Sequence, residues 1–125
     1  MKPSFWKYQL KYWIPVYLYL VLFFYLSSQP AIPASSFLAQ KFFISSYLQH
    51  VLIYTGLALM VYRAANYSKN SSNFLVIFST TLYGITDEIH QYFVPGRTFE
   101  FFDVGMDFLG AILALIIICL YRRLK

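Results

Sequence analysis

The sequence predicts an all-α membrane protein whose single domain, residues 1–125, is a bundle of four transmembrane helices. Hydrophobic residues make up 59% of the chain and charged residues only 12%, whereas soluble domains are about half apolar and a quarter charged. Four apolar segments are each long enough, with their aromatic flanks, to cross a bilayer. The predicted spans cover residues 12–28, 45–62, 74–94 and 102–121.

The first span follows a basic and aromatic segment, Met1 to Lys11, which is typical of an anchor at the membrane interface. A secretory signal peptide is the alternative, because a basic start and an apolar core precede the residues Ser27 to Ala31. Bulky tryptophan and tyrosine side chains crowd that core, which favours a retained span.

Polar segments separate the remaining spans. Residues 27–44 are predicted to form a loop with a short interfacial turn, and residues 64–73 a polar connection too short to be a domain. The third span is expected to stop at Pro95 and Gly96, because proline cannot continue the helical hydrogen-bond ladder.

The net charge of +5 indicates topology and not nucleic-acid binding, because the basic residues bracket the apolar segments instead of lining one face. Eight of the ten Lys and Arg residues fall in the N-terminal arm, the segment Arg63 to Lys69 and the C-terminal tail. With four spans these three segments share one side. The positive-inside rule predicts a multi-pass protein of the bacterial cytoplasmic membrane with both termini in the cytoplasm.

The ionisable chemistry is concentrated between Gly84 and Gly110. All the acidic residues of the chain lie there, together with His90 and Arg97. Charged groups at membrane depth cost about 2.5–3.5 kcal/mol each on insertion scales, so they are candidates for function. These acidic residues are Asp87, Glu88, Glu100, Asp103 and Asp107.

Three predicted helices carry polar residues to one depth. With a rise of 1.5 Å per residue, His50, Asp87, Glu88 and Asp107 all lie roughly 7–11 Å below the outer surface. This predicts one outward-facing pocket. Its candidate catalytic residues are Asp87, Glu88, His50, Arg97 and Asp103. Its candidate substrate-binding residues are Gln91, Tyr54, Asp107 and His90.

Helical spacing places the acids on two stripes that also carry small residues. Small residues let helices approach closely in lipid, so both stripes are expected to face the bundle interior. The stripe of the third span consists of Gly84, Asp87, Glu88 and Gln91. The stripe of the fourth consists of Asp103, Asp107, Gly110 and Ala114.

The segment Asp87-Glu88-Ile-His-Gln-Tyr-Phe-Val-Pro-Gly-Arg97, followed by Asp103-Val and Gly110-Ala, resembles the signature of the VanZ-like family of small bacterial membrane proteins. Ser27-Ser28-Gln29 and His50 with Tyr54 are similar to further recurring positions of that family. The resemblance implies a cell-envelope role, and glycopeptide resistance in the member linked to teicoplanin, without implying a reaction. Two departures are Asp107, where asparagine is expected, and Ala114, where glycine is common.

Like charges at i and i+4, such as Asp103 and Asp107, repel and need a neutralising partner. The candidates are Arg97, the two histidines, bound protons, or a divalent cation held by oxygen ligands. A phosphate would be repelled by this pocket unless Arg97 or a metal bridge held it. The cofactor therefore stays open between none and a divalent cation.

Each candidate also has a structural interpretation. Arg97 is as well placed for an ion pair with Asp103 or Glu100 as for contact with a ligand. For His50, a hydrogen bond to Asp87 or Tyr54 is the structural alternative to catalysis. His90 lies off the stripe and is expected at the interface, and the serines at 27 and 28 are expected to cap a helix end. The single cysteine excludes a thiol pair, and the chain lacks the motifs of phosphate loops and zinc proteases.

Three functions fit these observations. The first is an enzyme acting on a lipid-linked or polymeric cell-envelope component, with Arg97 as the anion clamp. The second is a non-catalytic accessory or binding protein that alters how envelope components or glycopeptides are presented. The third is a proton- or cation-linked carrier, which the apolar cytoplasmic halves disfavour. The expected partners are the lipid bilayer, an envelope precursor or glycopeptide, and a further copy of the chain.

Overall fold

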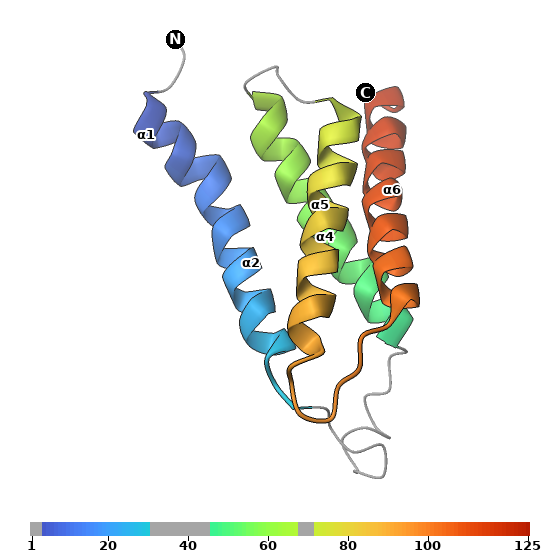
Figure 1. Ribbon diagram of the computed structural model, residues 1–125. Coiled ribbons are helices and arrows are strands. Elements are labelled where there is room, and N and C mark those ends of the chain that lie inside the picture. The colour runs from blue at the N-terminus through green and yellow to red at the C-terminus, as the bar shows by residue number, and fades with distance from the viewer. Residues whose placement is uncertain (1–3, 31–45, 68–71) are drawn as a thin grey trace, which may run out of the picture.

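The computed structural model describes residues 4–30, 46–67 and 72–125 of the chain, and these are mainly helical, with no strand within those ranges (Figure 1). The first rod, Phe5–Ser27, is continuous. It consists of α1 (Phe5–Tyr8), the π-helical turn η1 (Gln9–Trp13) and α2 (Ile14–Ser27). The other helices are α4 (Ser46–Tyr67), α5 (Asn73–Gln91) and α6 (Phe101–Arg123).

The first helix begins at Phe5, well before the predicted start at residue 12, and it contains a π-helical turn. Pro15 stands in the first turn of α2. Proline lacks a backbone N–H and its ring crowds the carbonyl of the preceding turn, and a locally widened helix relieves that crowding. The segment expected to be only an interface anchor is therefore helical from Phe5.

The other helix ends differ from the prediction by a few residues. Helix α4 continues to Tyr67 instead of ending at 62, and α5 begins at Asn73, where Ser72 caps the helix by accepting a hydrogen bond from the backbone of Leu75. Helix α5 ends at Gln91 and not at 94, because the residue before Pro95 avoids the helical region. Most of the loop predicted over residues 27–44, with its interfacial turn, lies outside the described residues.

Helix α6 packs closely against α4 through small residues. Gly110 lies so near α4 that an added Cβ would stand 2.7 Å from the carbonyl oxygen of Val51. The hydroxyl of Thr55 donates to the carbonyl oxygen of Gly110 at 3.0 Å. Below this contact Ala58, Ala111 and Ala114 are fully buried. Small side chains thus allow the close helix approach that the sequence stripe predicts.

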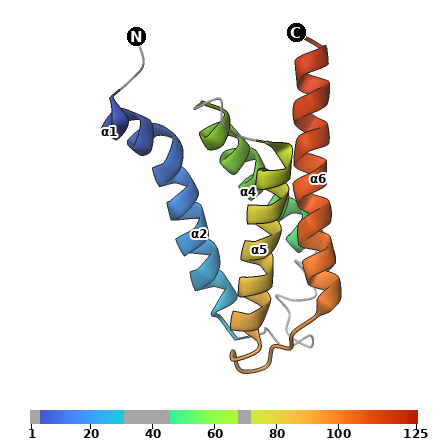
Figure 2. The same cartoon turned by 45° about the horizontal axis from the view of Figure 1, so that its top comes forward.

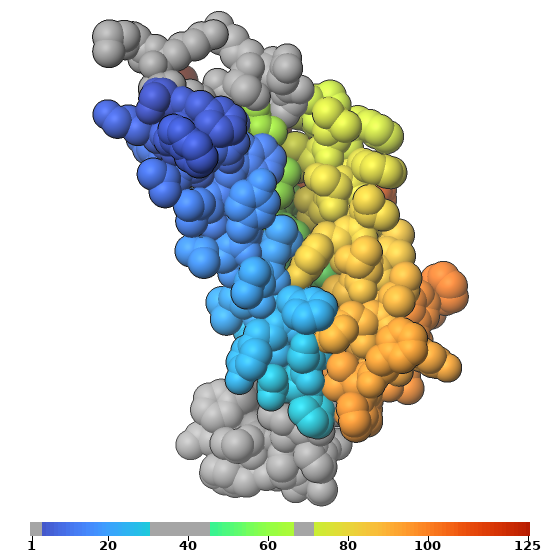
Figure 3. Space-filling model, turned by 60° about the vertical axis from the view of Figure 1, so that its left-hand side comes forward, coloured from blue at the N-terminus to red at the C-terminus, as the bar shows by residue number. Residues whose placement is uncertain are grey.

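The first rod lies beside α4 and α5 in the views of Figures 2 and 3 and is attached largely through tyrosine hydroxyls. Tyr8 donates to the carbonyl oxygen of Ala64, and Tyr19 to that of Ile53. Tyr83 of α5 donates to the carbonyl oxygen of Leu20 at 2.8 Å. These hydrogen bonds fix the rod against both neighbouring helices.

The start of α1 and the end of α6 lie at the same end of the bundle (Figure 1). Basic side chains at this end rest on aromatic rings: the guanidinium of Arg63 lies 5.5 Å from the ring of Tyr12, and that of Arg122 lies 5.3 Å from Tyr62. The opposite end carries the loop after α5, in which Gly96 has a φ of 78°. Arg63 and Arg122 thus lie at one end of the molecule, and the acidic stripes of α5 and α6 lie nearer the other end.

Two helices, Phe5–Ser27 and Phe101–Arg123, are long and apolar enough to cross a membrane. Helices α4 and α5 are less apolar because they carry the polar residues of the interior. Large apolar side chains are exposed on the outer faces of all four long helices, as expected for contact with lipid. Examples are Leu18, Val21, Leu52, Phe78 and Ile116.

Candidate functional site

Both acidic stripes face the interior of the bundle, as their helical spacing predicts. Every member of the α5 stripe and every member of the α6 stripe is buried. Glu88 and Asp107 have no exposed surface, and Asp87 and Asp103 keep only 5% and 6%. The carboxylates therefore lie between the helices and not at the lipid-facing surface.

His50 of α4 stands at the centre of three carboxylates. Its Nδ1 lies 2.8 Å from Oδ1 of Asp107. Its Nε2 lies 3.5 Å from Oδ2 of Asp103 and 3.9 Å from Oε1 of Glu88. We call His50, Glu88, Asp103 and Asp107 the His50 cluster. Three helices contribute to it, so sequence-distant residues meet as the common depth predicts.

Two further contacts hold the His50 cluster in place. A backbone N–H, that of Glu100, donates to Oε2 of Glu88 at 3.0 Å, which ties the loop after α5 to the buried acid. The carboxylate of Asp107 lies against Gly84, where a Cβ would overlap it. Glycine at 84 is thus needed to admit the Asp107 side chain between α5 and α6.

A second polar group connects Asp87 to the loop. The amide of Gln91 donates to Oδ2 of Asp87 at 3.0 Å, and Nη1 of Arg97 donates to Oε1 of Gln91 at 3.2 Å. Arg97 also donates through Nε to the carbonyl oxygen of Gln29. Within the described residues Arg97 forms no ion pair with Asp103 or Glu100, the pairing considered from the sequence, because the contacts with Gln91 and Gln29 direct its guanidinium towards the cavity.

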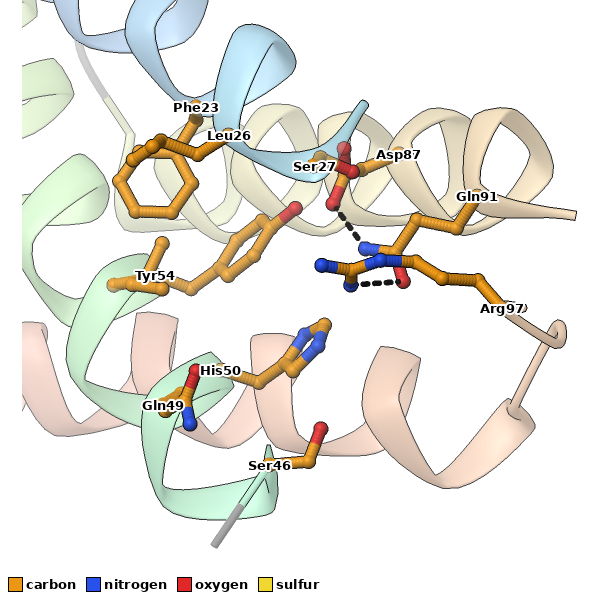
Figure 4. Close-up of a pocket in the computed structure, with 11 residues that line it drawn as sticks. Phe23, Leu26, Ser27, Ser46, Gln49, His50, Tyr54, Asp87, Gln91 and Arg97 are labelled. Atoms are coloured by element: carbon orange, nitrogen blue, oxygen red, sulfur yellow. Dashed lines mark hydrogen bonds between the residues drawn. The ribbon is translucent and has the colours of Figure 1, made fainter. Parts of the chain in front are cut away.

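A cavity of about 310 Å³ lies between α2, α4, α5 and the Arg97 loop (Figure 4). Figure 4 shows the Arg97 guanidinium extending between Gln91 and His50. The ring of Tyr54 is parallel to that of His50, with centroids 6.1 Å apart. The lining residues are Phe23, Leu26, Ser27, Ser46, Gln49, His50, Ile53, Tyr54, Asp87, Gln91 and Arg97.

Several polar atoms at this cavity have no hydrogen-bond partner among the described residues. They are the hydroxyls of Ser27 and Tyr54 and Oδ1 of Asp87. Buried polar atoms are almost always hydrogen-bonded in folded proteins, so such atoms mark places where a ligand or solvent is expected. The cavity therefore offers donors and acceptors to a polar molecule that enters it.

His90 lies apart from the cavity. Its Nε2 is 2.9 Å from the hydroxyl of Ser28, and its ring lies against the tilted ring of Phe24, with centroids 4.2 Å apart. His90 is half-buried. This agrees with the interfacial position predicted for His90 because it lies off the stripe of the third span. His90 thus ties α5 to the end of α2, and it does not join the other candidate residues.

The serines after the first span do more than cap a helix end. The hydroxyl of Ser28 does donate to the carbonyl oxygen of Phe24, as a cap would. Ser27, however, lines the cavity, and Ser46 and Gln49 line it from α4. The sequence did not predict that these residues line a cavity. Polar residues near the end of a span show no spacing pattern that distinguishes residues of a pocket from residues that cap a helix.

An all-helical bundle with an apolar outer surface and buried ionisable groups defines a membrane protein. The family model described as VanZ/LLP1 matches residues 4–122. The chain therefore belongs to the VanZ/LLP1 family, which confirms the resemblance found in the acidic signature. No curated protein and no solved structure matches the chain.

Proposed function

We propose that this VanZ-like protein crosses the bacterial cytoplasmic membrane four times and binds and acts on a lipid-linked or polymeric cell-envelope component in an outward-facing pocket. In this proposal both termini lie in the cytoplasm. A contribution to resistance against glycopeptides such as teicoplanin follows from the family and from action on envelope material. The proposed pocket is the cavity that Arg97 and His50 line.

The arrangement of charges supports this orientation. Arg63 and Arg122 lie at the end with the termini, and the Arg97 loop and the acidic stripes lie towards the other. Positive charges are retained on the cytoplasmic side during insertion. With the basic end in the cytoplasm, the cavity opens near the outer leaflet.

The observation that carries the binding proposal is the position of Arg97 over the cavity. Its guanidinium is directed by Gln91 and by the carbonyl oxygen of Gln29, with distances of 3.2 and 3.1 Å. A guanidinium has five N–H donors and suits phosphate or carboxylate groups. Two of these donors are engaged, which leaves others for an anionic head group. Phe23, Leu26 and Ile53 supply apolar walls for the adjoining lipid chain.

The His50 cluster supports a chemical role beyond binding. Asp107 orients the imidazole through Nδ1, and the second nitrogen lies among Asp103 and Glu88. An imidazole oriented by a carboxylate serves widely as a general base or acid. Asp87, with one oxygen free of hydrogen bonds to the described residues, is the second candidate for proton transfer.

The orientation is tested by cysteine labelling in intact cells, starting from Cys119→Ala, which removes the single thiol. A cysteine at exposed Thr98 is expected to react with a membrane-impermeant maleimide added outside. A cysteine at Leu124, 88% exposed, is expected to react only after the cells are opened. The reverse labelling pattern would place the cavity in the cytoplasm and refute the proposal.

The function is tested by complementation of a deletion strain. Arg97→Ala is expected to lower teicoplanin resistance to the level of the deletion, while Arg123→Ala at the opposite end is expected to keep it. Membrane levels of both variants are measured by immunoblotting. Full resistance with Arg97→Ala at normal protein levels would exclude the anion clamp.

A binding role without chemistry is the second candidate. Within the described chain no hydroxyl or thiol is hydrogen-bonded to His50, so a covalent nucleophile is not positioned there. Asp87→Asn and Glu88→Gln distinguish the two, because both keep the shape of the side chain and remove its acid-base function. Retained resistance in both variants would favour binding, and its loss in either would favour chemistry.

A proton- or cation-linked carrier is less well supported. Such a protein needs polar groups that continue from the His50 cluster to the opposite end of the bundle. Val76, Ala58, Ala111 and Ala114 form a buried apolar cluster on that side. The described residues therefore support a site open at one end.

A further inference from the structure

We infer that His50, Glu88 and Asp103 form a binding site for one divalent transition-metal ion, for which zinc is the best match. One donor atom from each residue, an imidazole nitrogen and two carboxylate oxygens, lies within 4.8 Å of the others. Imidazole nitrogen favours zinc and other transition metals, whereas magnesium and calcium favour sites made of oxygen alone. Three protein ligands are also the usual number in catalytic zinc sites.

The orientation of His50 suits a metal ligand. Nδ1 faces Oδ1 of Asp107 at 2.8 Å, and an ionised carboxylate only accepts hydrogen bonds, so the ring proton belongs on Nδ1. Nε2 then presents a lone pair towards Asp103 and Glu88. Metal-bound histidines commonly donate their other N–H to a carboxylate in this way. Asp107 thus acts as a positioning residue for the imidazole.

A lone pair that faces two carboxylates is unfavourable unless a positive charge or a carboxyl proton lies between them. With Glu88, Asp103 and Asp107 ionised, even a protonated His50 would leave two negative charges in excess. The described residues place no lysine or arginine in an ion pair with these acids. A divalent cation supplies the missing charge at the point where the three donors converge.

The spacing of the donors approaches that of a real site. Zinc binds nitrogen and oxygen at about 2.0–2.2 Å, so tetrahedral ligands stand about 3.4 Å apart. Nε2 of His50 is 3.5 Å from Oδ2 of Asp103 and 3.9 Å from Oε1 of Glu88. Both distances from Nε2 are therefore close to those of a bound site, and the two carboxylate oxygens lie within 4.8 Å of each other.

An independent observation also indicates a ligand here. Oε1 of Glu88 is buried, belongs to a side chain with no exposed surface, and has no hydrogen-bond partner among the described residues. The other oxygen of the same carboxylate is held by the backbone N–H of Glu100. The carboxylate is thus fixed with one oxygen directed at His50 and left for a further bond. Burial of such an oxygen is costly unless a cation or a proton is bound to it.

This inference deepens the proposed function, because His50 also lines the cavity, but metal binding itself does not depend on that function. A bound ion would lower the repulsion between the acids and an anionic head group in the cavity. It would also polarise a phosphoryl or carbonyl oxygen there as a Lewis acid. With the ion bound, His50 is a ligand and not the general base, and Asp87 remains the candidate for proton transfer. A protein that binds zinc without any envelope phenotype would support the site and refute the proposed function, so the two outcomes are separable.

The test uses the full chain, purified in detergent, stripped with EDTA and titrated with Zn²⁺. Calorimetry and elemental analysis are expected to give one ion per chain. His50→Gln, Glu88→Gln and Asp103→Asn are each expected to weaken Zn²⁺ binding more than about 100-fold, which exceeds the 10–100-fold typical of changes to residues that hydrogen-bond to a metal ligand. Asp107→Asn is expected to fall within that smaller range.

Glu100→Gln is the matched control, because it also removes one acidic charge beside the cluster while its backbone N–H to Glu88 remains. It is expected to bind Zn²⁺ as the wild type does. If a cluster variant fails to fold, Co²⁺ bound to the wild type gives a second measurement, with an absorption spectrum showing nitrogen and oxygen ligation. No ion in the wild type, equal loss in Glu100→Gln, or Co²⁺ without a nitrogen ligand would overturn the inference.

Discussion

Nδ1 of His50 and Oδ1 of Asp107 form a buried hydrogen bond of 2.8 Å that joins α4 to α6. On the side of α5, Gly84 leaves the space that the Asp107 carboxylate occupies. Three helices therefore meet at this one hydrogen bond, and its partners are fixed by packing as well as by charge. Substitutions here are expected to separate the structural role of Asp107 from its charge.

Asp107→Asn is expected to preserve the fold or to raise its stability by up to about 1 kcal/mol. The amide oxygen can accept the same hydrogen bond from His50, and the substitution removes one buried negative charge beside Asp103. Asp107→Leu is expected to lower stability by about 1–3 kcal/mol, because His50 then loses its partner. The thermal midpoints of both variants in one detergent test this pair. A less stable Asn variant would show that the charge itself holds the helices together.

Gly110→Ala is expected to lower stability by about 1–3 kcal/mol, because its Cβ would meet the backbone of α4, which cannot yield as a flexible side chain does. Gly105→Ala on the same helix is the control. A Cβ there has no heavy atom within 4 Å, and alanine favours a helix over glycine by about 1 kcal/mol. Gly105→Ala is thus expected to be neutral or stabilising. Equal thermal midpoints for the two variants would contradict the close contact of α4 and α6.

The burial of the acids could be predicted from spacing alone. Residues three and four apart share a helix face, and a face with carboxylates and glycine cannot be left in lipid, so the stripes had to point inward. The common depth of His50, Asp87 and Asp107 followed from counting residues along each span. These predictions depend only on distances along one helix, which the sequence contains.

The pairing inside the site could not be predicted in the same way. Whether His50 meets Asp107 or Asp87, and whether Arg97 meets Gln91 or Asp103, depends on the rotation of three helices about their axes. That rotation is set by close contacts such as that of Gly110 in α6 with α4 and that of Tyr83 in α5 with α2. The π-helical turn before Pro15 was also missed, because proline in an apolar run shows where strain occurs but not how it is relieved.

Tyr83→Phe is expected to loosen the first rod and to cost about 0.5–1.5 kcal/mol. The substitution keeps the ring and removes only the hydroxyl that donates to the carbonyl oxygen of Leu20. Tyr17→Phe is the control, because this exposed hydroxyl has no hydrogen bond within the described chain. Thermal midpoints and protease sensitivity of the rod are the measurements. A Tyr17→Phe variant as sensitive as Tyr83→Phe would contradict the role of this bond.

Gly96→Ala is expected to displace Arg97 and to impair function more than stability. Gly96 has a φ of 78°, a left-handed conformation that costs other L-residues about 1–2 kcal/mol. The neighbouring Arg97 is held over the cavity by this turn and by the hydrogen bond that its backbone N–H donates to the carbonyl oxygen of Val94. Alanine would favour a different turn, which moves the guanidinium away from Gln91.

Gly96→Asn is the control, because asparagine adopts the left-handed region more readily than other residues. The alanine variant is therefore expected to lose more teicoplanin resistance than the asparagine variant at equal membrane levels. Equal resistance in both variants would show that the position of Arg97 does not depend on the conformation of Gly96.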